Sequence, residues 1–140
     1  RLLAGPELLQ AQDEADFDSH LRPEARIASA TTVEKTTMGG SDCYKVKLVW
    51  KTGRETFDCF SVDTGLLVAS QGKTESSMGT LESTIIYSDV KEFDGIKIPT
   101  RLATQMMGAE QIIVLKEIHF NQVADTVFDP PAEVKALIKK

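Results

Sequence analysis

The stretch 43-CYKVKLVWKTGRETFDCFSVDTGLLV-68 gives the clearest indication of the fold of this chain. Apolar residues alternate with polar ones on both sides of "KTGR" (51–54), and a second break, "DTG" (63–65), precedes another apolar run. Alternation with a period of two indicates strands, and breaks that contain glycine indicate tight turns between them. The stretch therefore predicts consecutive antiparallel strands joined by short loops.

The same rhythm extends from about residue 26 to about residue 121, so the prediction covers most of the chain. A mainly β fold follows, in which each strand pairs with its neighbours in the sequence as an antiparallel meander. The further candidate turns are "MGGSD" (38–42), "SMGT" (77–80), "DG" (94–95) and "MGAE" (107–110).

A helix is predicted at each end of this sheet. The segment "PELLQAQDEADFDSHL" opens with proline followed by acidic residues, as helix starts do, and predicts an amphipathic helix over about residues 6–21. The segment "FDPPAEVKALIKK" predicts a short closing helix over about residues 131–139. We expect Val134, Leu137 and Ile138 to dock that helix, and residues 1–140 to form a single domain.

The composition excludes several classes of function. A net charge of −5, from 16 Lys and Arg against 21 Asp and Glu, argues against a nucleic-acid partner, which needs a basic face. The basic residues are scattered, so the sequence predicts no patch for an anionic membrane surface. No run approaches the roughly 18 apolar residues of a membrane span. The chain starts at Arg1 without Met, so we expect a processed form or an excised domain.

Hydrophobic matching predicts a register for the first hairpin. If "KTGR" is a four-residue loop, Leu48 lies opposite Phe57 and Val46 lies opposite Cys59. A shift by one residue would set an acidic residue opposite Val46, so the first register is favoured.

This register also makes a prediction about the two cysteines. Cys43 and Cys59 then point to opposite faces of the sheet, whereas a disulfide needs Cβ atoms about 3.5–4.5 Å apart. We therefore expect no disulfide, and we interpret both residues as small strand hydrophobes. They also lack the histidine partners of a zinc site.

The second hairpin is predicted in the same way. If "MGA" (107–109) is a three-residue loop, Leu102 lies opposite Val114 and Ile98 lies opposite Ile118. The preceding "DG" dipeptide is a strong tight-turn signal. This part of the chain is therefore interpreted as a corner of the sheet and not as a chemical site.

The motif "DTG" also occurs in aspartic proteases, whose catalytic carboxylate pair needs two such Asp residues. A single copy could serve only in a homodimer. Between two strands the same tripeptide is an ordinary β-turn in which Asp63 caps backbone N–H groups, and this interpretation is favoured.

The remaining titratable residues suggest only weak alternatives. An acidic group on the first helix could bind a cation, but it lacks the Gly turn and terminal Glu of an EF-hand and is interpreted as a solvated surface. The group consists of Asp13, Glu14, Asp16, Asp18 and His20. His119, Arg54, Lys97 and Arg101 are interpreted as solvated strand residues, although the three cations could pair with an anionic headgroup. We therefore predict no catalytic residue, no metal site and no cofactor, and the chain is not expected to be an enzyme.

One face of the predicted sheet carries more apolar side chains than two short helices can cover. That surplus requires closure into a barrel-like core, another protein chain or an apolar ligand. The residues expected to line this ligand-binding face are Val46, Leu48, Trp50, Phe57, Ile98, Leu102, Val114 and Ile118.

Residues 43–68, followed by "IIYSDVKEFDGIKIPTRL" (85–102), resemble the C-terminal portion of bacterial outer-membrane lipoprotein-sorting (LolA/LppX-like) proteins. In that family a strand pair ends in an Asp-x-x-Thr-Gly-Leu-like turn, and a Tyr-Ser-Asp…Asp-Gly-hydrophobic-x-hydrophobic-Pro segment follows. The matching residues here are Asp63, Thr64, Gly65 and Leu66, then Tyr87, Ser88, Asp89, Asp94, Gly95, Ile96, Ile98 and Pro99. Asp63 and Thr64 are adjacent, without the spacer of the family pattern.

The resemblance implies a strongly curved, incomplete antiparallel barrel whose concave apolar face and helical lid hold acyl chains. It also implies a periplasmic or outer-membrane location. Our hypothesis is a non-catalytic domain of the bacterial cell envelope that binds a lipid or lipoprotein acyl chain on the concave face. The alternative is a structural or interaction module, or a subunit of a larger envelope protein, that buries the same face against another chain.

Overall fold

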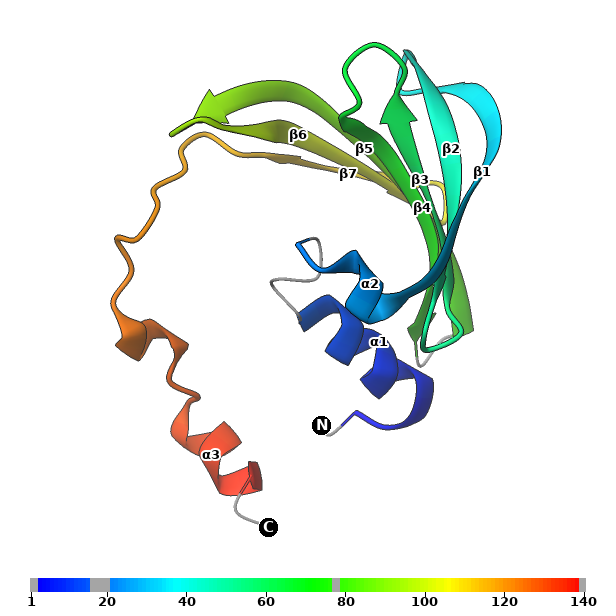
Figure 1. Ribbon diagram of the computed structural model, residues 1–140. Coiled ribbons are helices and arrows are strands. Elements are labelled where there is room, and N and C mark those ends of the chain that lie inside the picture. Colours follow the sequence, from blue (N-terminus) through cyan, green and yellow to red (C-terminus); the bar gives the residue numbers. More distant parts are fainter. Residues whose placement is uncertain (1–2, 16–20, 77–78, 139–140) are drawn as a thin grey trace.

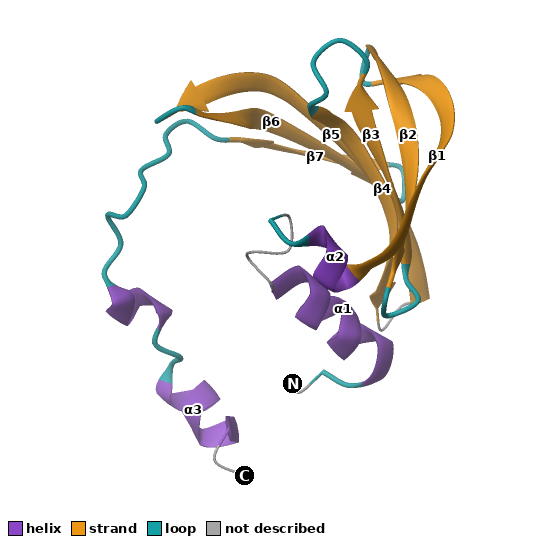
Figure 2. Cartoon of the chain, viewed as in Figure 1, coloured by secondary structure: helices purple, strands orange, loops and turns teal. Residues whose placement is uncertain are grey.

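The computed structural model describes residues 3–15, 21–76 and 79–138, and one antiparallel sheet dominates it (Figures 1 and 2). The sheet has seven strands in the order β1-β2-β3-β4-β5-β6-β7, so every strand pairs with its neighbours in the sequence. The strands are β1 (Ile27–Met38), β2 (Ser41–Trp50), β3 (Glu55–Ser61), β4 (Leu67–Ser76), β5 (Gly79–Phe93), β6 (Ile96–Met106) and β7 (Ala109–Val114). The predicted mainly β meander is confirmed, and the sheet is not closed.

Helices flank the sheet in the chain. They are α1 (Gly5–Ala15), α2 (Pro23–Arg26), a single 3-10 turn at Asp125–Phe128, and α3 (Ala132–Ile138). Figure 1 shows a strongly curved sheet with α1 and α2 on its concave side, whereas the chain after β7 runs away from the sheet.

Three two-residue turns explain the tight meander. Each has positive φ at both positions, the geometry of a type I′ turn, whose twist matches that of the strands it joins. The φ angles are 57° and 80° at Gly39 and Gly40, 47° and 81° at Asp94 and Gly95, and 53° and 76° at Met107 and Gly108. The predicted "DG" turn is therefore confirmed.

The predicted register of β2 and β3 is wrong by one residue. Val46 lies opposite Asp58, the pairing that hydrophobic matching rejected. The loop is one residue shorter than the predicted "KTGR", because Arg54 pairs with Trp50, whose N–H donates to the carbonyl of Arg54 (2.8 Å). Asp58 is tolerated in the sheet because its carboxylate accepts a 2.7 Å hydrogen bond from the hydroxyl of Ser70 on β4.

This register places Cys43 and Cys59 on the same face, and they form a disulfide with a Cα–Cα distance of 5.5 Å. The prediction of no disulfide is therefore wrong, and the cause is the one-residue slip, which moves every side chain of one strand to the other face. Both cysteines are fully buried. We call the cluster around them the disulfide core, and it consists of Cys43, Cys59 and Ala69, with Met38, Val68 and Ile86 packed against them.

The predicted register of β6 and β7 is also wrong by one residue. Val114 lies opposite Arg101 and not opposite Leu102, because Met107 accepts a positive φ and the loop needs only two residues. The strand ends at Val114, so the predicted pairing of Ile98 with Ile118 is wrong as well.

The helix predictions are confirmed in part. The structure ends α1 at Ala15, residues 16–20 lie outside the described part of the chain, and α2 begins separately at Pro23. The closing helix α3 is present, but Val134 and Leu137 are 43% and 51% exposed, so they do not dock it. The side chain of Ile138 lies outside the described residues.

Candidate functional site

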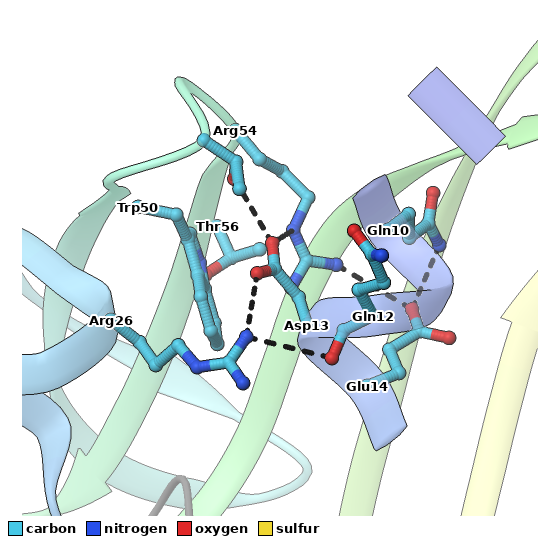
Figure 3. A network of polar contacts seen from close by, with 9 residues as sticks. Gln10, Gln12, Asp13, Glu14, Arg26, Trp50, Arg54 and Thr56 are labelled. Atoms are coloured by element: carbon cyan, nitrogen blue, oxygen red, sulfur yellow. Dashed lines mark hydrogen bonds and ion pairs between the residues drawn. The ribbon is translucent and has the colours of Figure 1, made fainter. Parts of the chain in front are cut away.

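The most buried charged side chain in the described residues is Asp13, on α1, which is only 4% exposed. Its Oδ1 lies 3.2 Å from Nη1 of Arg26, and its Oδ2 accepts a 2.9 Å hydrogen bond from the hydroxyl of Thr52. Nε of Arg54 lies 3.9 Å from the same Oδ2. Figure 3 shows Asp13 between the two arginines. The prediction that Asp13 is a solvated surface acid is wrong, because a buried carboxylate persists only where cations and hydrogen bonds replace water.

Arg54 joins this network to the sheet. Its guanidinium carbon lies 4.4 Å from the centre of the Trp50 ring, and its Nη1 lies 3.5 Å from Oε1 of Glu14 (Figure 3). The indole N–H of Trp50 donates a 2.9 Å hydrogen bond to the hydroxyl of Thr56. The side chain of Arg54 is only 20% exposed, so the prediction of a solvated strand charge is wrong for this residue.

The same contacts attach both helices to the β2–β3 turn. Besides binding Asp13, Arg26 donates a 3.5 Å hydrogen bond to the carbonyl of Gln12 on α1. Nζ of Lys51 donates to the carbonyl of Glu24 on α2 (2.8 Å). The set Asp13, Arg26, Trp50, Thr52 and Arg54, the Asp13 cluster, therefore fixes α1 and α2 at one end of the sheet.

A cavity of about 620 Å³ opens beside this cluster, between α1 and strands β2 to β5. Its volume lies within the roughly 300–1,000 Å³ of small-molecule sites. Helix α1 contributes Leu9, Gln10 and Asp13, and the sheet contributes Phe57 and Gln71. The wall is thus mixed, with an aromatic ring among amide and charged groups.

Charged side chains around this cavity pair with one another. Nζ of Lys73 lies 3.2 Å from Glu82, and both side chains are well exposed. Nζ of Lys45 lies 5.0 Å from the centre of the Phe57 ring. Three acids, Asp13, Glu55 and Glu82, and three bases, Lys45, Arg54 and Lys73, line the cavity, so it carries no concentrated charge of either sign.

The predicted ligand-binding residues divide between the two faces of the sheet. Alternation along the strands puts five of them on one face, which we call the tryptophan face: Val46, Leu48, Trp50, Ile98 and Leu102. Phe57 and Val114 point to the opposite face, the disulfide face, and Ile118 lies beyond the last strand. The prediction of one shared face is therefore wrong for Phe57 and Val114, because both hairpins slip by one position, and for Ile118, because β7 ends at Val114.

The tryptophan face carries two apolar groups: Val46, Leu48 and Trp50 on β2, and Ile85, Tyr87 and Leu102 on β5 and β6. Polar residues of β3 and β4, Thr56, Asp58 and Ser70, lie between them on the same face. All of its predicted residues are partly exposed, and none is buried. Among the predicted residues, Phe57 alone lines the 620 Å³ cavity. The apolar groups and the cavity are therefore separate features.

The described residues include no candidate group of metal ligands. Within residues 3–15, 21–76 and 79–138, no group of three or more His, Cys, Asp or Glu side chains could hold a metal ion. Asp16, Asp18 and His20, proposed above as one cation-site alternative, fall outside those ranges. His119 is 61% exposed and lies 3.5 Å from Glu117. None of the described helices is long and apolar enough to cross a membrane.

The "DTG" segment forms the predicted turn, but its backbone N–H groups bond to Ser61 and not, as predicted, to Asp63. The N–H of Gly65 donates to the carbonyl of Ser61 (2.9 Å), and the N–H of Thr64 donates to the Ser61 hydroxyl (3.2 Å). Ser61 thus supplies acceptors within the turn that connects β3 and β4.

Comparison with known proteins gives no identity: no family model matches the chain, and no curated protein or solved structure matches it.

Proposed function

We propose that this chain is a non-catalytic binding domain of the bacterial cell envelope that shelters a lipid or lipoprotein acyl chain against its curved, open sheet. One observation carries the proposal. The largest fully buried side chains in the described part of the molecule are those of two cysteines, while the large residues of the tryptophan face stay in contact with solvent.

Incomplete burial of the tryptophan face leaves free energy to be gained by binding. Complete burial of one Val, Leu, Ile or Phe side chain is worth about 1.5–3 kcal/mol relative to exposure. Residues such as Leu48 and Leu102 realise only part of that gain within the chain itself. Large apolar side chains left partly exposed on one face of a sheet are typical of an interaction site. An acyl chain laid along this face would supply the missing contacts.

The proposed location rests on two observations. Disulfides persist in oxidising compartments such as the bacterial periplasm, and Cys43–Cys59 is such a bond. The motifs of residues 43–68 and 85–102 resemble lipoprotein-sorting proteins of the outer membrane.

A second candidate function is an interaction module that covers its apolar surface with another protein chain. The segment after β7 favours it, because apolar side chains there are exposed without forming a sheet or a docked helix. Val123, Val127 and Phe128 are 56%, 68% and 76% exposed. A partner chain could bury this segment together with the tryptophan face.

Titration with a fluorescent fatty-acid probe tests the first candidate. We expect saturable binding by the wild-type chain and its loss in Leu48→Lys and Leu102→Lys, which place a charge on the tryptophan face. Val49→Lys, on the opposite face of β2, is the matched control and should bind as the wild type does. Circular dichroism spectra should agree among all variants.

Absence of saturable binding by the folded wild-type chain would refute the acyl-chain proposal. Light scattering with detergent-washed envelope proteins from the source cells then addresses the second candidate. A chain that stays monomeric there and binds no probe would count against both functions.

A further inference from the structure

Strand β7 ends the sheet with an uncovered edge. It is the last strand in the sheet order, and all six of its residues, Ala109–Val114, are exposed. Figure 1 shows that the chain leaves the sheet after this strand and does not return along it. The outer side of β7 is therefore free to pair with another strand.

The direction of the backbone groups on β7 follows from one hydrogen bond. The N–H of Leu115 donates to the carbonyl of Thr100 on β6 (2.8 Å). Every second residue before Leu115 therefore also directs its backbone N–H and C=O groups toward β6. The alternate residues, Glu110, Ile112 and Val114, therefore direct their N–H and C=O groups outward.

Strand β1, at the other edge of the sheet, has features that hinder pairing with another strand, and β7 has none of them. Strand β1 has register irregularities between Ile27 and Ser29 and between Thr32 and Glu34, and it carries Lys35. Bulges and lysines are the usual means by which proteins block edge-to-edge pairing. The sequence "AEQIIV" of β7 contains no Lys, Pro or Gly, and its register with β6 is unbroken.

We propose that β7 pairs antiparallel with β7 of a second copy of this chain, about a two-fold axis at Ile113. A two-fold axis perpendicular to the sheet pairs residues of the same face, so the two residue numbers must have an even sum. Centred on Ile113, this rule sets Ile112 opposite Val114 and Glu110 opposite Lys116 of the other copy.

Charge complementarity selects this register. Lys116 is exposed directly after Leu115, whose N–H still bonds to β6, so the strand geometry reaches its position. The symmetry creates the Glu110–Lys116 pair twice, once at each end of the interface. A register centred on Ile112 is also geometrically allowed, but it sets Glu110 opposite Val114 and forms no charge pair. On its own sheet Glu110 accepts a 3.5 Å hydrogen bond from Gln105.

The pairing also gives hydrogen-bond partners to the outward backbone groups of β7. Glu110, Ile112, Val114 and Lys116 occupy the hydrogen-bonded positions, where their outward groups meet those of the partner. Ile113 then occupies a non-hydrogen-bonded position on the axis, where opposing side chains are closest.

Cysteine cross-linking tests the register directly. The chain has two cysteines, both in one disulfide, so a third is the sole free thiol. We expect Ile113→Cys to form a disulfide-linked dimer under mild oxidation, with Gln111→Cys as the matched control that stays monomeric, because Gln111 faces Leu115. Cross-linking through Ile112→Cys but not Ile113→Cys would overturn the proposed register.

Charge reversal tests the interface without new thiols. Sedimentation should show a concentration-dependent wild-type dimer, weakened roughly tenfold by Glu110→Lys or Lys116→Glu, since like charges then face each other at both ends. The double variant should restore the wild-type dimer. A monomeric wild type at millimolar concentration, or a dimer insensitive to all three variants, would overturn the proposal.

Discussion

The disulfide core and the C-terminal arm, residues 115–138, use apolar side chains in opposite ways. In the core, Cys43, Cys59 and Ala69 are small, and each is essentially inaccessible to solvent. In the arm, Phe128 is large and 76% exposed. Burial in this chain therefore depends on how many strands surround a residue and not on how hydrophobic the residue is.

The physical reason lies in the sheet. Side chains at the middle of the curved sheet have strands on both sides, and the β1–β2 turn reaches Ile86 on β5. The arm has no such neighbours, because its chain leaves the sheet after Val114. Perturbing the two regions should therefore have very different consequences for the free energy of unfolding.

The largest effect is expected from loss of the disulfide. The double substitution Cys43→Ala and Cys59→Ala should lower the free energy of unfolding by about 3 kcal/mol, because the bond closes a loop with a sequence separation of 16 residues. Denaturation in guanidinium measures this loss. The wild type in reducing buffer should behave like the double variant, and a loss below about 1 kcal/mol would contradict the central role of the core.

A smaller effect is expected from filling the contact between the β1–β2 turn and β5. A Cβ at Gly39 would lie 2.5 Å from Cγ2 of Ile86, whereas a Cβ at Gly40 would have no neighbour within 4 Å. Both positions have positive φ, so each Gly→Ala change carries a backbone cost of about 1–2 kcal/mol. Gly39→Ala should cost about 1–3 kcal/mol more than its control, Gly40→Ala, because of the added overpacking.

Thermal unfolding of both variants measures that difference. Equal unfolding midpoints for the two variants would mean that the β1–β2 turn does not contact Ile86 in solution, and that the core is packed less tightly there.

The smallest effect is expected in the arm. Val134→Asp and Leu137→Asp should each change the free energy of unfolding by less than about 0.5 kcal/mol, since both side chains are already about half exposed. Ile86→Asp is the contrasting variant and should be strongly destabilising. A loss above about 1 kcal/mol for either arm variant would show that α3 packs on the sheet in solution.

The meander itself could be predicted from the sequence, because period-two alternation and the glycine turns are local signals. The strand registers could not be predicted, because hydrophobic matching between strands takes no account of the geometry of the turn that joins them. Met107 adopts a positive φ that favours a two-residue loop, and Asp58 finds a hydroxyl partner on the next strand. Each error shifted one strand by one position and thereby misplaced Phe57 and Val114.

The Asp13 cluster was also missed. Nothing local distinguishes Asp13 from the other acids of its helix, since its partners Arg26, Thr52 and Arg54 lie far along the chain. The one available signal was Arg54 beside Trp50 across a turn, an arrangement suited to a cation resting on an aromatic ring. Contacts between distant segments require the fold before they can be recognised.

The disulfide joins adjacent strands of a single hairpin, and this has a consequence for how the protein matures. The disulfide can form only when both sulfur atoms lie on the same face of the hairpin. A chain whose strands pair one residue out of register therefore stays reduced and can still rearrange. Formation of the disulfide thus selects the native register of the two strands and fixes it covalently.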